Sequence, residues 1–241
     1  MSGHNKWSTI KHKKGKADAE RGKIFSRLVK EISVAAREGG GDVDMNPRLR
    51  VAIDTAKSQN MPNDNIDRAI KRGTGELEGV TYEEITYEAY GPGGVAILIE
   101  VLTDNRNRSA AEIRHTLSKG GGSLGSRTSV AYLFSKQGQL TVDASAFTEE
   151  LVMEAGMEAG LDDVYLDEGL LVLSSAPEAV FRVKDALETA GVKVESAEIV
   201  KVPANTVALS GREAEQNVRL LNALEETEDI QAVYSNFEQA D

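Results

Sequence analysis

The stretch Gly91-Pro-Gly-Gly-Val-Ala-Ile-Leu-Ile-Glu-Val-Leu102 divides this chain of 241 residues into a helical part and a β-rich part. Four turn-forming residues precede eight residues that are almost all apolar, a pattern typical of a tight turn followed by a buried strand. The segment just before it, residues 82–90, has the β-type period of a hairpin partner. These glycines open onto a strand, whereas phosphate loops open onto a helix, so a nucleotide site is not expected here.

The residues before this hairpin follow the period of α-helices. The apolar positions of the first helix are Ile24, Phe25, Leu28, Val29, Ile32 and Ala36, and three glycines at residues 39–41 end it. Asn46 and Pro47 are suited to capping and starting a second helix. A third, short helix ends at Gly73. The pattern predicts a small bundle of three helices.

The residues after the hairpin alternate between strands and helices. A helix is expected over residues 110–119 and a strand over 130–134. Strand, helix, strand, strand, helix and strand follow at residues 139–142, 147–159, 163–166, 170–173, 177–190 and 192–200, the order of a ferredoxin-like domain. The tail adds a strand at 207–209, a helix at 213–224 and a strand at 230–237. This tail is expected to return to the domain of the hairpin and to supply the one strand and one helix that it lacks.

These patterns predict an α+β protein with three domains. An N-terminal three-helix domain over residues 1–78 is followed by two α/β domains of ferredoxin-like type. The middle one is formed by residues 79–136 plus 205–241, and the last, residues 137–204, is inserted into it.

Composition excludes several classes of function. The chain has no cysteine, which rules out disulfides and thiolate metal sites, and its three histidines lie far apart without the spacing of metal ligands. No catalytic, metal-binding or cofactor-binding sequence motif is recognisable. No apolar run is long enough to span a membrane. We therefore expect a cytoplasmic protein that is not an enzyme and binds no cofactor, metal or membrane.

Charge points to the N-terminus as the functional segment. Residues 1–30 contain nine Lys or Arg and two acids, a net charge of +7, in a chain whose net charge is −11. Residues 1–78 carry +5 and residues 79–241 carry −16. Such a concentration of positive charge is favourable opposite phosphates. The predicted nucleic-acid-binding residues are Lys6, Lys11, His12, Lys13, Lys14, Lys16, Arg21, Lys23, Arg27 and Lys30.

The last three of these residues lie on one side of the first helix. At about 100° per residue, Lys23, Arg27 and Lys30 fall opposite the apolar stripe, and they are expected to be exposed. They fit either a nucleic-acid contact or the solvated face of an amphipathic helix. Arg106 and Arg108, next to the start of a later helix, form a second set of candidates, with the same alternative of simple solvation.

Seven motifs in order carry a family resemblance. They are Gly3-His-Asn-Lys-Trp7, Arg21-Gly-Lys-Ile-Phe25, Gly39-Gly-Gly-Asp42 with Asn46-Pro-Arg-Leu-Arg50, Asn60-Met-Pro62 with Arg68-Ala-Ile70, Tyr90-Gly-Pro-Gly-Gly94, Thr103-Asp-Asn-Arg-Asn-Arg108 and Ser129-Val-Ala-Tyr-Leu-Phe134. Together they resemble the YebC/PmpR family. Asn5 stands where a serine is commoner in that family, and Gly15 interrupts the basic run.

The resemblance implies a three-domain cytoplasmic protein and leaves two functions open. Members are usually described as DNA-binding transcriptional regulators. Relatives, including a mitochondrial translational activator of cytochrome oxidase, act on the ribosome and help synthesis through stretches such as consecutive prolines. The expected partner is therefore nucleic acid, either duplex DNA or ribosomal RNA. A protein-binding adaptor that uses the acidic domains is the third alternative.

Overall fold

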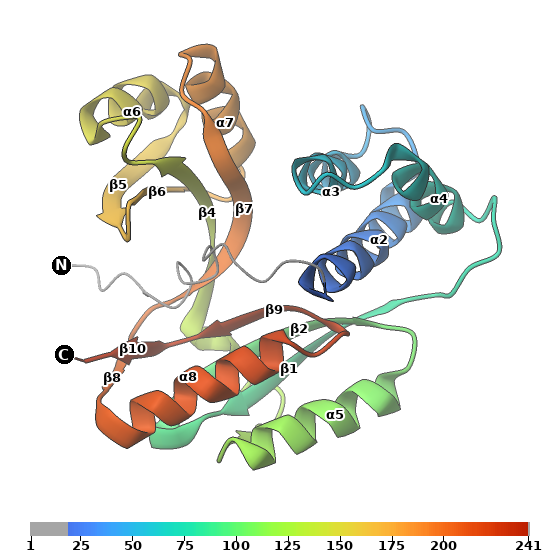
Figure 1. Cartoon of the computed structure of the whole chain (residues 1–241), viewed down its shortest axis with the longest axis vertical. Helices are drawn as coiled ribbons and strands as arrows, with labels where there is room; N and C mark the ends of the chain where they lie inside the picture. The colour runs from blue at the N-terminus through green and yellow to red at the C-terminus, as the bar shows by residue number, and fades with distance from the viewer. Residues whose placement is uncertain (1–18, 241) are drawn as a thin grey trace. The chain divides into compact units, whose positions relative to one another are not determined.

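The computed structural model describes residues 19–240, except for the side chains of residues 19–21 (Figure 1). Its helices are α2 (Ala19–Gly39), α3 (Pro47–Ser58), α4 (Asn63–Gly73), α5 (Arg106–Lys119), α6 (Glu149–Gly156), α7 (Val180–Thr189) and α8 (Gly211–Glu225). Its strands are β1 (Glu83–Tyr90), β2 (Ala96–Thr103), β3 (Ser123–Leu124), β4 (Phe134–Asp143), β5 (Leu161–Asp167), β6 (Leu170–Ser175), β7 (Val194–Pro203), β8 (Val207–Leu209), β9 (Ile230–Ser235) and β10 (Phe237–Gln239). Short 3₁₀ turns cover Pro92–Gly94, Ala131–Leu133 and Met157–Ala159. The predicted α+β class is confirmed.

The chain forms two compact units. The first contains described residues 19–129 and 211–233, and the second contains residues 130–210 and 234–240. The helical bundle and the sheet that follows it belong to the first unit. The domain boundaries predicted at residues 78, 136 and 204 stay predictions.

Helices α2, α3 and α4 pack around an apolar core. Its buried residues are Ile32, Ala35, Ala36, Leu49, Ala52, Ile53, Ala56, Met61, Ile66 and Ala69. The predicted cap of α3 is confirmed, because the Asn46 side chain accepts a hydrogen bond from the backbone N–H of Leu49. At the crossing of α2 and α4, a Cβ added to Gly73 would lie 2.3 Å from the carbonyl oxygen of Ser33. The two helices therefore approach each other closely enough to require glycine at this position.

The predicted hairpin is formed by β1 and β2, which pair antiparallel from Glu83 opposite Thr103 to Tyr90 opposite Ala96. The complete sheet has the strand order β3-β1-β2-β9, so the tail of the chain supplies an edge strand. Helices α5 and α8 pack next to each other in this unit (Figure 1). Their close contact depends on small residues, since a Cβ on Gly120 of the turn after α5 would lie 2.6 Å from Leu220.

The second unit has a four-stranded antiparallel sheet of order β5-β6-β4-β7. With α6 and α7 this is the predicted ferredoxin-like succession of strands and helices. The core between the helices and the sheet includes Leu140, Val142, Leu173, Val183 and Leu187, all fully buried. β8 and β10 pair parallel in a separate two-stranded sheet.

One predicted strand is wrong. Residues 131–133 form a 3₁₀ turn in which the N–H of Leu133 donates to the carbonyl of Val130, and the strand β4 begins only at Phe134. Val130 is fully buried while Tyr132 is 76% exposed. A short apolar run has no period long enough to distinguish a strand from a turn of helix, so the sequence pattern was ambiguous here.

Candidate nucleic-acid interface

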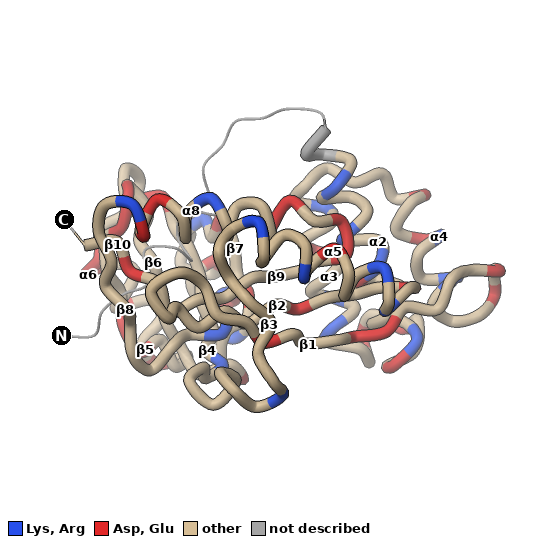
Figure 2. The backbone as a smooth tube through the Cα atoms, turned by 90° about the horizontal axis from the view of Figure 1, so that it is seen from below, with Lys and Arg blue, Asp and Glu red and all other residues tan. Residues whose placement is uncertain are grey.

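The predicted basic residues divide into those that the structure describes and those that it does not. Lys6, Lys11, His12, Lys13, Lys14 and Lys16 lie outside the described residues. Arg21 lies in the first turn of α2. Lys23, Arg27 and Lys30 follow along the same helix at spacings of four and three residues, which places them on one side of it. We call these three residues the α2 basic stripe. Figure 2 marks basic and acidic residues along the chain.

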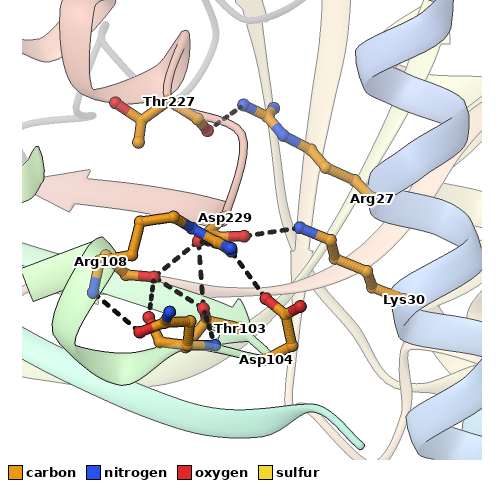
Figure 3. A network of polar contacts seen from close by, with 9 residues as sticks. Arg27, Lys30, Thr103, Asp104, Arg108, Thr227 and Asp229 are labelled. Atoms are coloured by element: carbon orange, nitrogen blue, oxygen red, sulfur yellow. Dashed lines mark hydrogen bonds and ion pairs between the residues drawn. The ribbon is translucent and has the colours of Figure 1, made fainter. Parts of the chain in front are cut away.

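All three residues of the α2 basic stripe contact one short segment, residues 225–229, where α8 ends and β9 begins. The Nζ of Lys23 donates to the carbonyl of Glu226 at 3.1 Å. The guanidinium of Arg27 donates to the carbonyls of Glu225 and Thr227. The Nζ of Lys30 lies 2.7 Å from Oδ1 of Asp229 (Figure 3).

This arrangement follows from the chemistry of a helix end. The last carbonyl groups of a helix have no partner within the helix, and they carry the negative end of its dipole. Lys23 and Arg27 supply donors and positive charge at the end of α8. Burial lowers the pKa of Arg27, and the neighbouring carboxylate of Glu225 opposes that effect.

The expected exposure of this side of α2 is therefore wrong for two of its residues. Lys30 is buried, with 7% of its surface exposed, and Arg27 is half-buried. Lys23 is exposed. The partner segment lies about 200 residues further along the chain, as the sequence separations of 203 for Lys23 and 199 for Lys30 show. No local pattern around α2 could have indicated it.

Asp229 is the centre of a polar network that sequence reasoning missed. Besides Lys30, its carboxylate accepts hydrogen bonds from Ser109 Oγ at 2.6 Å, Arg108 Nη2 at 2.8 Å and Thr103 Oγ1 at 3.1 Å (Figure 3). Only 2% of Asp229 is exposed. Burial alone would raise the pKa of Asp229, but the bonds from Lys30, Ser109 and Arg108 outweigh burial and hold this pKa well below its usual range.

Of the second set of candidates, Arg108 belongs to this network and Arg106 does not. Arg106 and Arg108 both lie in the first turn of α5, because Asn105 caps the helix by accepting from the N–H of Arg108. Arg108 also bonds Asp104 at 2.7 Å, and its bonds to Asp229 and Asp104 raise its pKa. Arg108 thus has structural partners, so simple solvation describes it wrongly. Arg106 is exposed.

Two family models match this chain one after the other. Residues 5–76 match the model of the TACO1/YebC protein N-terminal domain, and residues 82–237 match that of the TACO1/YebC second and third domain. The chain belongs to the TACO1/YebC family. This confirms the resemblance inferred from the seven motifs.

Other proteins are similar to this TACO1/YebC chain over nearly its whole length. A probable transcriptional regulatory protein of Desulfatibacillum aliphaticivorans is 57% identical over 236 residues, which cover 98% of this chain and 96% of the relative. One of Geobacter sulfurreducens is 54% identical over 238 residues, with coverages of 99% and 96%. The crystal structure of a conserved hypothetical protein from Aquifex aeolicus has 48% identity and a TM-score of 0.89, and the match covers 98% of this chain and 97% of that one.

Within the described residues, no group of three or more His, Asp or Glu side chains is placed to hold a metal ion. Residues 19–240 also contain no helix that is both long and apolar enough to cross a bilayer.

Proposed function

We propose that this protein is a non-enzymatic regulator of gene expression that binds nucleic acid through its N-terminal segment, and that its target is duplex DNA. The observation that carries the proposal is the reversal of charge at the N-terminus, +7 over residues 1–30 in a chain of −11. The name shared by its relatives, probable transcriptional regulatory protein, supports the same role. Its site of action would be the cytoplasm.

The lysines before α2 supply the main contacts in this proposal. Lys23, Arg27 and Lys30 already have partners within the protein, and Arg21 and Lys23 lie nearest in sequence to the lysines before α2. Residues 6–16 contain no Asp or Glu. They include five lysines, at positions 6, 11, 13, 14 and 16, together with His12. Lysine is a point charge that suits phosphate contact better than base reading, so affinity should come mainly from the nucleic-acid backbone.

The test is substitution of Lys11, Lys13, Lys14 and Lys16 by Ala. Each phosphate contact contributes about 0.9 to the slope of log K against log salt, so loss of four contacts should reduce that slope by roughly 3 to 4. Binding of a labelled duplex would be measured by fluorescence anisotropy from about 50 to 200 mM salt. Unchanged affinity and slope would remove this segment from the function.

A second candidate function is action on the ribosome. It is favoured by the same lysine-rich composition, because a segment that contacts phosphates without reading bases also fits folded RNA. Competition between ribosomes and promoter-bearing duplex, followed by co-sedimentation, separates the two. Retention on ribosomes despite excess duplex supports a translation factor that relieves stalling, and release to one promoter but not to a scrambled duplex supports transcriptional regulation. Complexes that survive nuclease treatment would instead support a protein-binding adaptor.

A further inference from the structure

The segment that covers the α2 basic stripe is unusually acidic. Residues 225–229 read Glu-Glu-Thr-Glu-Asp, four carboxylates among five residues. We call this segment the acidic corner. Asp229 and Thr227 are buried, whereas Glu226 and Glu228 are exposed. The corner presents carbonyl oxygens to Lys23 and Arg27 and a carboxylate oxygen to Lys30. A row of bases thus faces a row of acceptor oxygens within a strongly negative segment.

A nucleic-acid backbone would present the same kind of groups to the same bases. Phosphate oxygens carry full negative charge, and hydrogen bonds to charged acceptors are roughly twice as strong as those to neutral carbonyls. Lys23 and Arg27 now bond carbonyl oxygens. Exchange of a carbonyl for a phosphate at these two residues would therefore be favourable.

The network around Asp229 allows Lys30 to leave without stranding the carboxylate. Asp229 retains three other donors, from Arg108, Ser109 and Thr103. Lys30 in turn lies 5.8 Å from the centre of the Tyr82 ring, whose electron-rich face attracts the ammonium. A buried carboxylate without a partner would destabilise the protein, and the donors of Arg108, Ser109 and Thr103 keep Asp229 paired when Lys30 leaves.

The lysines at positions 6, 11, 13, 14 and 16, which we call the basic segment, lie shortly before α2 in the sequence. Lys23 lies one helical turn after the first residue of that helix. A strand held by the segment would therefore be at high effective concentration beside the α2 basic stripe. Accordingly, we propose that the α2 basic stripe is a second phosphate-binding surface for the same nucleic acid, and that the acidic corner covers it as an internal competitor. This inference depends on the proposed function.

The first test neutralises the exposed part of the corner. In the variant Glu226→Gln/Glu228→Gln the buried network is unchanged, and affinity for a labelled duplex should rise about threefold to tenfold at low salt, with the gain shrinking as salt screens it. The matched control is Glu213→Gln/Glu215→Gln, which changes the same net charge at exposed positions of α8. Equal gains in the two variants would overturn the proposal, because they would reflect net charge alone.

The second test opens the surface through Asp229→Asn. Release of Lys30 should add one phosphate contact and steepen the slope of log K against log salt by about 1, because Lys30 is the stripe residue that pairs with Asp229. Adding Lys30→Ala to this variant should remove that gain. A gain that persists in full, or no gain in a variant shown by circular dichroism to be folded, would overturn the inference. If Asp229→Asn does not fold, the comparison of Glu226→Gln/Glu228→Gln with Glu213→Gln/Glu215→Gln decides whether the inference holds.

These outcomes separate this inference from the proposed function. A wild-type protein that binds neither duplex nor folded RNA, or binds them without the lysines before α2, would overturn both. Binding that depends on those lysines but does not respond to the acidic corner would overturn only the covered surface.

Discussion

The ammonium of Lys30 lies 2.7 Å from Oδ1 of Asp229, although 199 residues separate them in the chain. Lys30 is in the helical bundle, and Asp229 immediately precedes β9 of the neighbouring sheet. Both are almost completely buried, so their ion pair is shielded from solvent and salt. It joins the first helix of the described chain to the segment that the tail contributes to the sheet.

Removal of either partner should destabilise the protein, but unequally. Asp229→Ala leaves the Lys30 ammonium buried without its ion-pair partner, and a loss of about 3–5 kcal/mol is expected. Lys30→Ala should cost less, because Asp229 keeps Arg108, Ser109 and Thr103 as donors. Urea unfolding followed by circular dichroism measures both. Glu215→Ala breaks only an exposed pair with Arg219 and serves as a control, with a change within about 0.5 kcal/mol.

The same network predicts how stability depends on acid. The pKa of Asp229 is lower in the folded protein than in the unfolded chain, where an aspartate titrates near pH 4. Its contribution is therefore complete above about pH 4 and is lost as pH falls from there through the folded-state pKa. Urea midpoints recorded from neutral pH to about pH 3 should fall less steeply for Asp229→Asn than for the wild type. Parallel curves for the two proteins would show that other carboxylates govern acid unfolding.

Asn46 should be the most sensitive capping residue of the bundle. Its Oδ1 accepts from the N–H of Leu49, and its Nδ2 donates to the carbonyls of Ala35 and Gly40, both at 2.8 Å. Asn46→Ala removes the cap, worth about 1 kcal/mol, and also leaves the buried carbonyl of Ala35 without this donor, so a total of roughly 2–4 kcal/mol is expected. Thermal unfolding of Asn46→Ser, which can restore the cap but not both carbonyl bonds, should give an intermediate loss. If Ser and Ala are equivalent, the cap contributes nothing here.

Local signals predicted most of the elements of this fold. Asn46 and Pro47 mark the start of α3 because capping is decided within four residues, and the glycines after β1 mark the hairpin for the same reason. The start of α5 was predicted four residues late because the bases of its first turn resemble a polar loop. This first turn is held by two bonds to Asn105, from the N–H of Arg108 to its side chain and from the N–H of Ser109 to its carbonyl.

The candidate site could be predicted less completely. The positive charge at the N-terminus is visible in the sequence, but the partners of Lys23, Arg27 and Lys30 are not, because they are provided by residues 225–229. A solvated base and a base that closes a buried network have the same spacing along a helix. The acidic run at residues 225–229 is the one feature of the sequence that could have indicated a partner for these bases. That it is their partner is visible only in the fold, where α8 and β9 bring it against α2.

Two glycines at the two ends of the bundle should respond in opposite directions to alanine. At Gly73 an added Cβ would lie 2.3 Å from the carbonyl oxygen of Ser33 and 2.8 Å from Cβ of Ala36, so α2 and α4 must move apart. We expect Gly73→Ala to cost about 1–3 kcal/mol, as overpacked sites do. Gly22 lies in α2 with nothing within 4 Å of an added Cβ, so Gly22→Ala should stabilise by up to about 1 kcal/mol through helix propensity. Thermal unfolding of the two variants tests the close approach of α2 and α4 directly, because a neutral Gly73→Ala would mean that the helices do not pack as tightly as the structure shows.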